Sequence, residues 1–155
     1  IEIFSIKKLI EESQELFTQK IKNKEIAFEL QMENEYFIKA KSLQLSQVIV
    51  NLINNSIDAI EELNEKWIKV KVEQKADTCI IQVVDSGMGI PKEIASKLMT
   101  PFYTTKGPGK GTGLGLSLSK KMIEEAKGKF YYDDSKPNTT FCIELPIGKQ
   151  EDKVA

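Results

Sequence analysis

The chain has 155 residues, 41% of them hydrophobic and 29% charged, which predicts one compact domain with its own core. Its 22 basic residues, all lysines, nearly balance 23 acidic ones, and the net charge of −1 excludes a broad positive field for nucleic acid or an anionic membrane. Histidine is absent, which excludes imidazole metal sites, Ser-His-Asp catalysis and formation of phosphohistidine on this chain.

The first 85 residues hold two predicted helices and five predicted strands. The helices are expected at about 6–21, with Ser5 as the N-cap, and at about 42–62. The predicted strands lie at about 2–5, 25–31, 35–39, 67–74 and 78–85, and the last two form a hairpin.

The second half of the chain begins with a concentration of glycine. Seven of the nine glycines lie between positions 87 and 115, which predicts a long loop region whose backbone approaches another molecule closely. A helix at about 112–126, ended by Gly128, and strands at about 129–132 and 139–145 follow. Residues 149–155 are expected to form a polar tail, so the domain spans 1–148.

The cysteines and the apolar runs bear on the location of the chain. Cys79 and Cys142 lie in apolar, strand-like runs and are expected to be small buried side chains in a reducing compartment. No apolar run approaches the roughly 18 to 20 residues of a membrane span. We therefore expect a cytoplasmic chain without membrane insertion. Because it begins at Ile1, we expect it to be a segment of a longer protein, membrane-anchored or not.

The order of the elements predicts an α+β fold. Helices and strands do not alternate strictly, and several neighbouring strands can pair as hairpins, so we expect a mixed sheet packed on one face by about three helices. This is a two-layer α/β sandwich. A doubly wound nucleotide-binding fold is the competing architecture, but neither G-x-G-x-x-G nor G-x-x-x-x-G-K-[ST] occurs in the chain.

The predicted helix at 42–62 carries a narrow polar stripe. At 100° per residue, Gln47, Asn51, Asn55 and Asp58 fall within about 80° of one another, and the remaining directions are mostly apolar. Solvent-facing stripes are usually rich in lysine and glutamate, whereas asparagine is a poor helix former. Amide and carboxylate oxygens suit Mg²⁺, so the stripe faces either a ligand that carries this ion or plain solvent.

Two glycine-rich segments extend this pattern. Asp85 ends an apolar strand in DSGMGIP (85–91), and its carboxylate suits the exocyclic amine of adenine; a plain glycine-rich turn is the other interpretation. The segment GPGKGTGLGL (107–116) brings backbone N–H groups to a predicted helix N-terminus, which suits a phosphate chain. Lys106 and Lys110 add positive charge there, although Lys110 also fits a solvated loop lysine.

Four motifs in this order resemble those of the catalytic and ATP-binding domain of bacterial sensor histidine kinases, in the superfamily of gyrase, Hsp90, histidine kinases and MutL. They are the N box QVIVNLINNSIDAI (47–60), the G1 box DSGMGI (85–90), the F box PFYTTK (101–106) and the G2 box GTGLGL (111–116). The resemblance spans essentially the whole chain and implies the Bergerat-type ATP-binding fold. Asp58 and Ala59 make the N box similar to that of nitrogen-regulation and sporulation-type kinases.

The resemblance implies a role for each motif residue. Asn55 is the implied Mg²⁺ ligand, and Asn51, near the phosphates, is an implied catalytic residue together with Lys106. Asp85 is implied to hold the adenine amine. The other implied ATP contacts are Asp58 in the N box; Gly87, Gly89 and Ile90 at the base; Thr104, Thr105 and Lys110 beside the phosphates; Gly111, Thr112, Gly113, Leu114, Gly115 and Leu116 around them; and Thr139 in the adenine network. The segment between Phe102 and Gly111 is the implied glycine-rich ATP lid.

The chain departs from the family pattern at two places. The last motif usually reads G-T-x-F, but here Asn138 stands in the glycine position before Thr139; asparagine tolerates left-handed backbone better than most residues. The implied lid contains no arginine, so lysines would face the phosphates as point charges.

Position 51 helps to choose among the chemistries of the superfamily. Its hydrolysing members carry glutamate here, whereas Asn51 cannot take a proton at physiological pH, which disfavours an ATPase switch. We therefore expect phosphoryl transfer from Mg-ATP to a histidine on dimerisation helices of the same or a partner chain, with a downstream response regulator. An anti-sigma-type protein serine kinase and a non-catalytic nucleotide-binding or scaffolding module of this fold are the alternatives.

Overall fold

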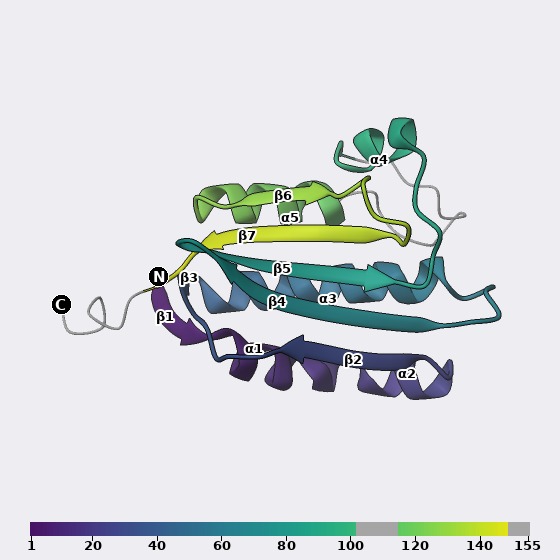
Figure 1. Ribbon diagram of the computed structural model, residues 1–155, viewed down its shortest axis with the longest axis horizontal. Helices are drawn as coiled ribbons and strands as arrows, with labels where there is room; N and C mark the ends of the chain where they lie inside the picture. Colours follow the sequence, from purple (N-terminus) through teal and green to yellow (C-terminus); the bar gives the residue numbers. More distant parts are fainter. Residues whose placement is uncertain (102–114, 149–155) are drawn as a thin grey trace.

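The fold is seen in a computed structural model that describes residues 1–101 and 115–148 (Figure 1). Its helices are α1 (Ile6–Ser13), α2 (Thr18–Asn23), α3 (Ser42–Ala59), α4 (Lys92–Leu98) and α5 (Gly115–Glu125), with a 3₁₀ turn η1 at Gln14–Leu16. Its strands are β1 (Glu2–Ser5), β2 (Ala27–Met32), β3 (Phe37–Ala40), β4 (Trp67–Lys75), β5 (Thr78–Asp85), β6 (Lys129–Tyr132) and β7 (Thr140–Pro146).

The main sheet has five strands in the order β2-β4-β5-β7-β6. β2 runs parallel to β4, with Ala27 opposite Trp67, and the other three pairings are antiparallel. β1 and β3 form a separate two-stranded antiparallel sheet. The sheet is therefore mixed, as the sequence predicts, and β4 and β5 form the predicted hairpin, in which Ala76 of the two-residue loop has a φ of 55°.

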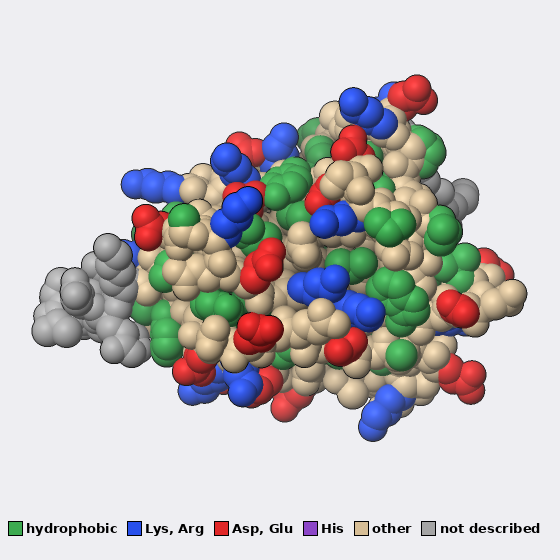
Figure 2. Space-filling model, viewed as in Figure 1, with side chains coloured by type: hydrophobic (Ala, Val, Ile, Leu, Met, Phe, Trp, Pro, Cys, Tyr) green, Lys and Arg blue, Asp and Glu red, His purple; other side chains and the backbone are tan. Residues whose placement is uncertain are grey.

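The core lies between one face of this sheet and the helices behind it in Figure 1. Residues of β4 alternate, so that Ile68, Val70 and Val72 are buried while Lys69 and Lys71 point to the other face. Figure 2 looks onto that other face, where basic, acidic and apolar side chains are interspersed. The α+β two-layer arrangement expected from the sequence is confirmed.

The long helix α3 supplies much of the core. Its buried apolar residues lie on the side away from the polar stripe; they are Leu45, Val48, Ile49, Leu52, Ile53 and Ile57. Ala59 is exposed, and the helix ends there rather than at position 62. The narrow polar stripe that the sequence predicts is thus left outside the core.

Cys79 and Cys142 are buried and free, as predicted. Burial raises the pKa of the Cys79 thiol to about 12, so this side chain is an inert apolar group at physiological pH. Ser5 is the predicted N-cap of α1, since its hydroxyl accepts from the N–H of Lys8 at 3.3 Å.

The structure corrects three expectations about helices. The helix expected at 6–21 is broken at η1, because Phe17 leaves the helical conformation (φ −133°) to place its ring in the core against Phe28, 5.4 Å away between ring centroids. Leu16 is 65% exposed as a result. The short helix α4 was not predicted. The sequence predicts that Gly128 ends the last helix, but the residue with left-handed backbone after α5 is Lys127, with a φ of 64°.

Candidate functional site

The polar stripe of α3 lies beside the start of α5. Asn51 and Asn55 are half-buried, while Gln47 and Asp58 at the two ends of the stripe are exposed. The Nδ2 of Asn51 donates to the hydroxyl of Ser119, at 3.4 Å, and this serine is buried on α5. The two helices therefore meet at Asn51.

The first described residue of α5, Gly115, packs directly on Asn51. A Cβ atom at Gly115 would lie 2.7 Å from Oδ1 of Asn51 and 2.8 Å from its Nδ2. Only a residue without a side chain allows this approach while Asn51 keeps its position. The described start of α5 is thereby held against the amide of Asn51.

Asp85, at the end of β5, is a buried carboxylate with only 2% of its surface exposed. Its Oδ1 accepts from the N–H of Gly87 at 2.8 Å, and the hydroxyls of Ser56 and Thr139 also hydrogen-bond to the carboxylate. Burial raises the pKa of Asp85, and these three hydrogen bonds oppose that rise. The site therefore holds a buried acceptor, with its donors supplied from α3, from the loop after β5 and from the residue just before β7.

The loop that follows Asp85 is held close to the start of β7. The N–H of Gly89, whose φ is +97°, donates to the hydroxyl of Thr139 at 3.2 Å. A Cβ at Gly87 would lie 2.8 Å from both the Asp85 carboxylate and the Thr139 hydroxyl, so the loop needs glycine there. The N–H of Ile90 donates to the hydroxyl of Tyr132 at 2.8 Å.

Asn138 occupies the glycine position of the last motif without left-handed backbone. Asn138 is absent from the residues with positive φ in the described part of the chain, so its backbone is one that any residue adopts. Its Nδ2 donates to the carbonyl of Gly87 at 3.3 Å, and the N–H of Thr139 donates to the same carbonyl at 3.0 Å. The departure from the family pattern thus adds a side-chain contact to the loop.

The structure brings part of the predicted site together. Gly87 and Thr139 contact the Asp85 carboxylate, the Thr139 hydroxyl also binds Gly89, and Ile90 follows in the same loop. Gly115 packs on Asn51 of the stripe, one turn from Asn55, and the next residue, Leu116, packs against the core. Asp58 lies further along α3, where its charge and that of Glu61 act on Lys24 of the α2 end. The predicted residues Thr104, Thr105, Lys106, Lys110, Gly111, Thr112, Gly113 and Leu114 lie outside the described residues.

Three residues of the site were missed from the sequence, namely Ser56, Ser119 and Tyr132. Asn138 was noted in the last motif, but its contact with the loop was not foreseen. A signal for two of them exists, because Ser56 lies next to Asn55 on a buried side of the helix where apolar residues dominate, and Ser119 interrupts the apolar side of α5. No pattern in the strand sequence distinguishes Tyr132 from its neighbour Tyr131.

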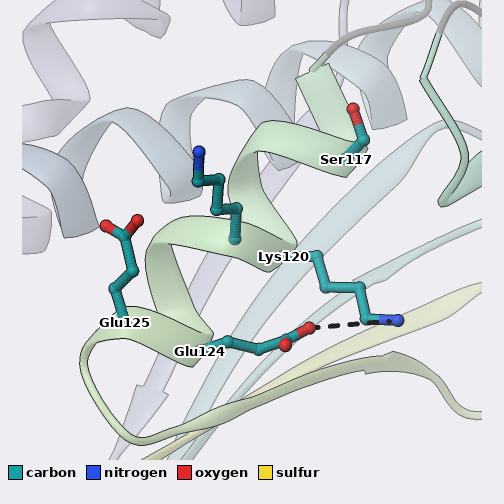
Figure 3. Close-up of a pocket in the computed structure, with 5 residues that line it drawn as sticks. Ser117, Lys120, Glu124 and Glu125 are labelled. Atoms are coloured by element: carbon teal, nitrogen blue, oxygen red, sulfur yellow. Dashed lines mark ion pairs between the residues drawn. The ribbon is translucent and has the colours of Figure 1, made fainter.

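A shallow depression on α5 lies apart from these residues (Figure 3). It is lined by Ser117, Lys120, Lys121, Glu124 and Glu125, all from this one helix. Lys120 and Glu124 form an exposed ion pair at 3.9 Å, a contact of little energetic weight. The depression carries opposite charges, and within residues 1–101 and 115–148 no other element forms a wall against it, so these residues form a helix face rather than a ligand site.

Residues 1–101 and 115–148 contain no group of three or more His, Cys, Asp or Glu side chains placed to hold a metal ion. Over the same ranges, every helix is too short or too polar to cross a membrane.

Comparison with known proteins identifies the class. Residues 40–149 match the family described as histidine kinase-, DNA gyrase B- and HSP90-like ATPase. The catalytic domain of histidine kinase ThkA is 35% identical, with a TM-score of 0.84 and coverage of 94% of each chain. Sporulation kinase B of Bacillus subtilis (strain 168) is 30% identical over 94% of this chain. The ThkA complex with the response regulator protein TrrA matches at 31% identity and a TM-score of 0.80, over 95% of this chain and 42% of that one.

The chain belongs to the family of histidine kinase-, DNA gyrase B- and HSP90-like ATPases, whose nucleotide is ATP. Within that family, its sequence and fold are those of a histidine kinase catalytic domain, which confirms the resemblance stated from the four motifs. The chain spans about a third of the length of sporulation kinase B.

Proposed function

We propose that this domain binds ATP with Mg²⁺ and presents the γ-phosphate to a histidine on a separate helical domain. The observation that carries the proposal is the buried carboxylate of Asp85, fixed between the loop and β7 on the same side of the sheet as the asparagine stripe of α3. One end of this site suits a base and the other suits phosphates.

The base end suits adenine. The Asp85 carboxylate accepts one backbone N–H and hydroxyl hydrogen bonds, and two oxygens offer further lone pairs to the exocyclic amine of the base. A carboxylate is an acceptor only, so it favours an amine over a carbonyl oxygen at that place. Gly89 and the half-buried Ile90 lie on the loop beside it and would contact the ring.

The phosphate end suits a hard cation held by few protein oxygens. Asn51 and Asn55 present amide groups from a half-buried stripe, one turn apart. Mg²⁺ prefers oxygen ligands and keeps several waters or phosphate oxygens, so a pair of amides fits it better than a zinc ion. Asn55 would hold the ion, and the ion would neutralise charge on the phosphates.

Asn51 favours transfer of the phosphoryl group over hydrolysis. The Asn51 side chain cannot remove a proton from water, and its Nδ2 is engaged by Ser119. Transfer to a protein side chain requires chiefly positioning and charge stabilisation. Since the chain contains no histidine, the acceptor would be a histidine on dimerisation helices of the same or a partner chain.

The partners and the location follow from the same proposal. A response regulator would receive the phosphoryl group downstream, in line with the solved complex of ThkA with TrrA. Such an exchange would take place in the cytoplasm, where ATP is available.

The test is phosphoryl transfer in trans. The chain is incubated with Mg-ATP labelled at the γ-phosphate, alone and with the histidine-bearing dimerisation helices of a sporulation kinase. We expect no label on the chain itself and acid-labile, base-stable label on the helices, abolished by Asn55→Ala and by a chelator. Label on this chain would contradict the proposal. Release of free phosphate from ATP with no label on the helices would contradict it too.

A further inference from the structure

The loop between β5 and α4 is fastened by two hydroxyl groups, one from the residue that precedes β7 and one from the edge strand β6. Thr139, just before β7, binds the N–H of Gly89 at 3.2 Å, and Tyr132, the last residue of β6, accepts from the N–H of Ile90 at 2.8 Å. Thr139 belongs to a motif that the sequence analysis singled out, whereas Tyr132 belongs to none. The shorter of the two contacts therefore comes from a residue without an assigned role.

Tyr132 is itself held rigidly. It lies opposite Phe141 in the β6–β7 ladder, and the two rings meet edge-on, with 5.3 Å between centroids and 61° between planes. The Tyr132 ring packs against the hydrophobic core, and β7 pairs in turn with β5. Its hydroxyl is consequently a fixed point of the sheet rather than a mobile surface group.

The loop needs such a fixed point. Met88 is 82% exposed and Gly89 is exposed with left-handed backbone, so this part of the loop has few contacts with the core. Ile90 is the residue at which the loop returns to the core, and α4 begins two residues later. The Tyr132 hydroxyl thus decides where Ile90 and the preceding Gly89 lie relative to the Asp85 carboxylate.

We propose that Tyr132 is a positioning residue for the base end of the nucleotide site, because its hydroxyl fixes Ile90 and Gly89 in the place where they contact adenine. This inference rests on the proposed ATP binding and adds a determinant outside the four motifs. Tyr132 acts on affinity for the base and leaves the phosphate contacts unchanged, since among the described residues its hydroxyl bonds to the loop that follows Asp85.

The neighbouring tyrosine offers a matched control. Tyr131 points to the opposite face of β6, where its hydroxyl donates to the Glu144 carboxylate at 2.5 Å. Tyr131→Phe and Tyr132→Phe therefore remove the same atom from adjacent residues of one strand. Only Tyr132→Phe leaves a loop N–H without its partner, and phenylalanine keeps the ring contact with Phe141.

The experiment measures affinity for adenosine and for Mg-ATP in the wild type and both variants, together with hydrogen exchange of the Ile90 amide. A neutral hydrogen bond corresponds to roughly a two- to tenfold change in affinity. We expect Tyr132→Phe to weaken the binding of adenosine and of Mg-ATP by this same factor and to speed hydrogen exchange of the Ile90 amide. Tyr131→Phe should change neither the two affinities nor the exchange rate.

The outcomes separate the two proposals. If the wild type binds Mg-ATP, and Tyr132→Phe binds adenosine as tightly as the wild type does, the positioning role is wrong and the proposed function stands. A loss confined to Mg-ATP, or an equal loss in Tyr131→Phe, would also overturn it. If the wild type binds neither ligand, the proposed function fails and this inference fails with it. Thermal midpoints of the two variants show whether a loss reflects unfolding.

Discussion

Asp85 and Thr139 are joined through both backbone and side chain: the N–H of Asp85 donates to the Thr139 carbonyl at 3.1 Å, and the Thr139 hydroxyl hydrogen-bonds to the Asp85 carboxylate. The same hydroxyl accepts from the N–H of Gly89. A hydroxyl can donate one hydrogen bond and accept others, so Thr139 serves the carboxylate and the loop at once. The end of the site that is proposed to hold the base is therefore fixed by the end of β5 and by the residue that precedes β7.

Thr139→Val should destabilise the domain and weaken ATP binding. Valine keeps the shape of this buried side chain but leaves the carboxylate without one donor and the Gly89 N–H without its acceptor. A buried polar group that loses its partner costs about 1–3 kcal/mol. Urea denaturation and titration with Mg-ATP measure the two effects.

Two further substitutions control for the loss of a buried hydroxyl. Thr139→Ser retains the oxygen and should restore most of the affinity. Thr140→Val removes a hydroxyl that is equally buried but donates to the Asn138 carbonyl, so it should lower stability without a comparable loss of affinity. If Thr139→Val and Thr140→Val bind Mg-ATP with equal affinity, the Thr139 hydroxyl has no specific part in binding.

Asp85→Asn should alter the choice of base. A charge-assisted hydrogen bond is worth about 1.5–3 kcal/mol, so we expect roughly a tenfold to hundredfold loss of ATP affinity. GTP should lose less, because the carboxylate that favours the amine of adenine repels the carbonyl oxygen of guanine. Competition titrations with the two nucleotides give the ratio, and an equal loss for both would assign Asp85 a structural role only.

The same substitution should change how stability depends on pH. Burial raises the pKa of Asp85 above its ordinary value of 3.8, so the folded protein binds the proton more readily than the unfolded chain. The contribution of Asp85 to stability is then complete below 3.8 and is lost as the pH rises through the native pKa. Asparagine does not titrate, so Asp85→Asn should gain stability relative to the wild type between acidic and neutral pH. Urea denaturation at several pH values in the absence of nucleotide tests this, and a relative stability that falls with pH would contradict it.

The sequence predicts the parts of the site that depend on local pattern. The stripe with Asn51 and Asn55 follows from helical periodicity, and the place of Asp85 follows from the end of an apolar run. Each pattern lies within a single element, where spacing alone determines which residues share a face. The family motifs then assign roles to the same positions.

Contacts between distant elements could not be predicted in this way. The bonds from Tyr132 to Ile90 and from Ser119 to Asn51 span 42 and 68 positions, and depend on how β6 and α5 pack against the rest of the fold. The break after α1 arises for a related reason, because the core contact of Phe17 with Phe28 outweighs helix propensity.

Gly115→Ala should weaken ATP binding by displacing Asn51. The new methyl group would lie 2.7 Å from Oδ1 of Asn51, so the amide must turn away and give up its 3.4 Å hydrogen bond with Ser119. We expect Mg-ATP to lose affinity while adenosine does not, because Asn51 lies at the phosphate end. Equal losses for the two ligands would place Gly115 near the base instead.

A double-mutant cycle with Asn51→Ala tests the clash itself. Inside a helix, alanine is more favourable than glycine by about 1 kcal/mol, so Gly115→Ala at the start of α5 should add part of that amount wherever the methyl group fits. In the Asn51→Ala background the space beside residue 115 is open, and the full gain should appear in urea denaturation. In the wild-type background, displacement of the Asn51 amide should cancel part of this gain in stability. The coupling free energy between positions 51 and 115 should then be roughly 0.5–1 kcal/mol. Additive effects on stability would show that Asn51 moves aside freely, and the loss of Mg-ATP affinity would then need a different cause.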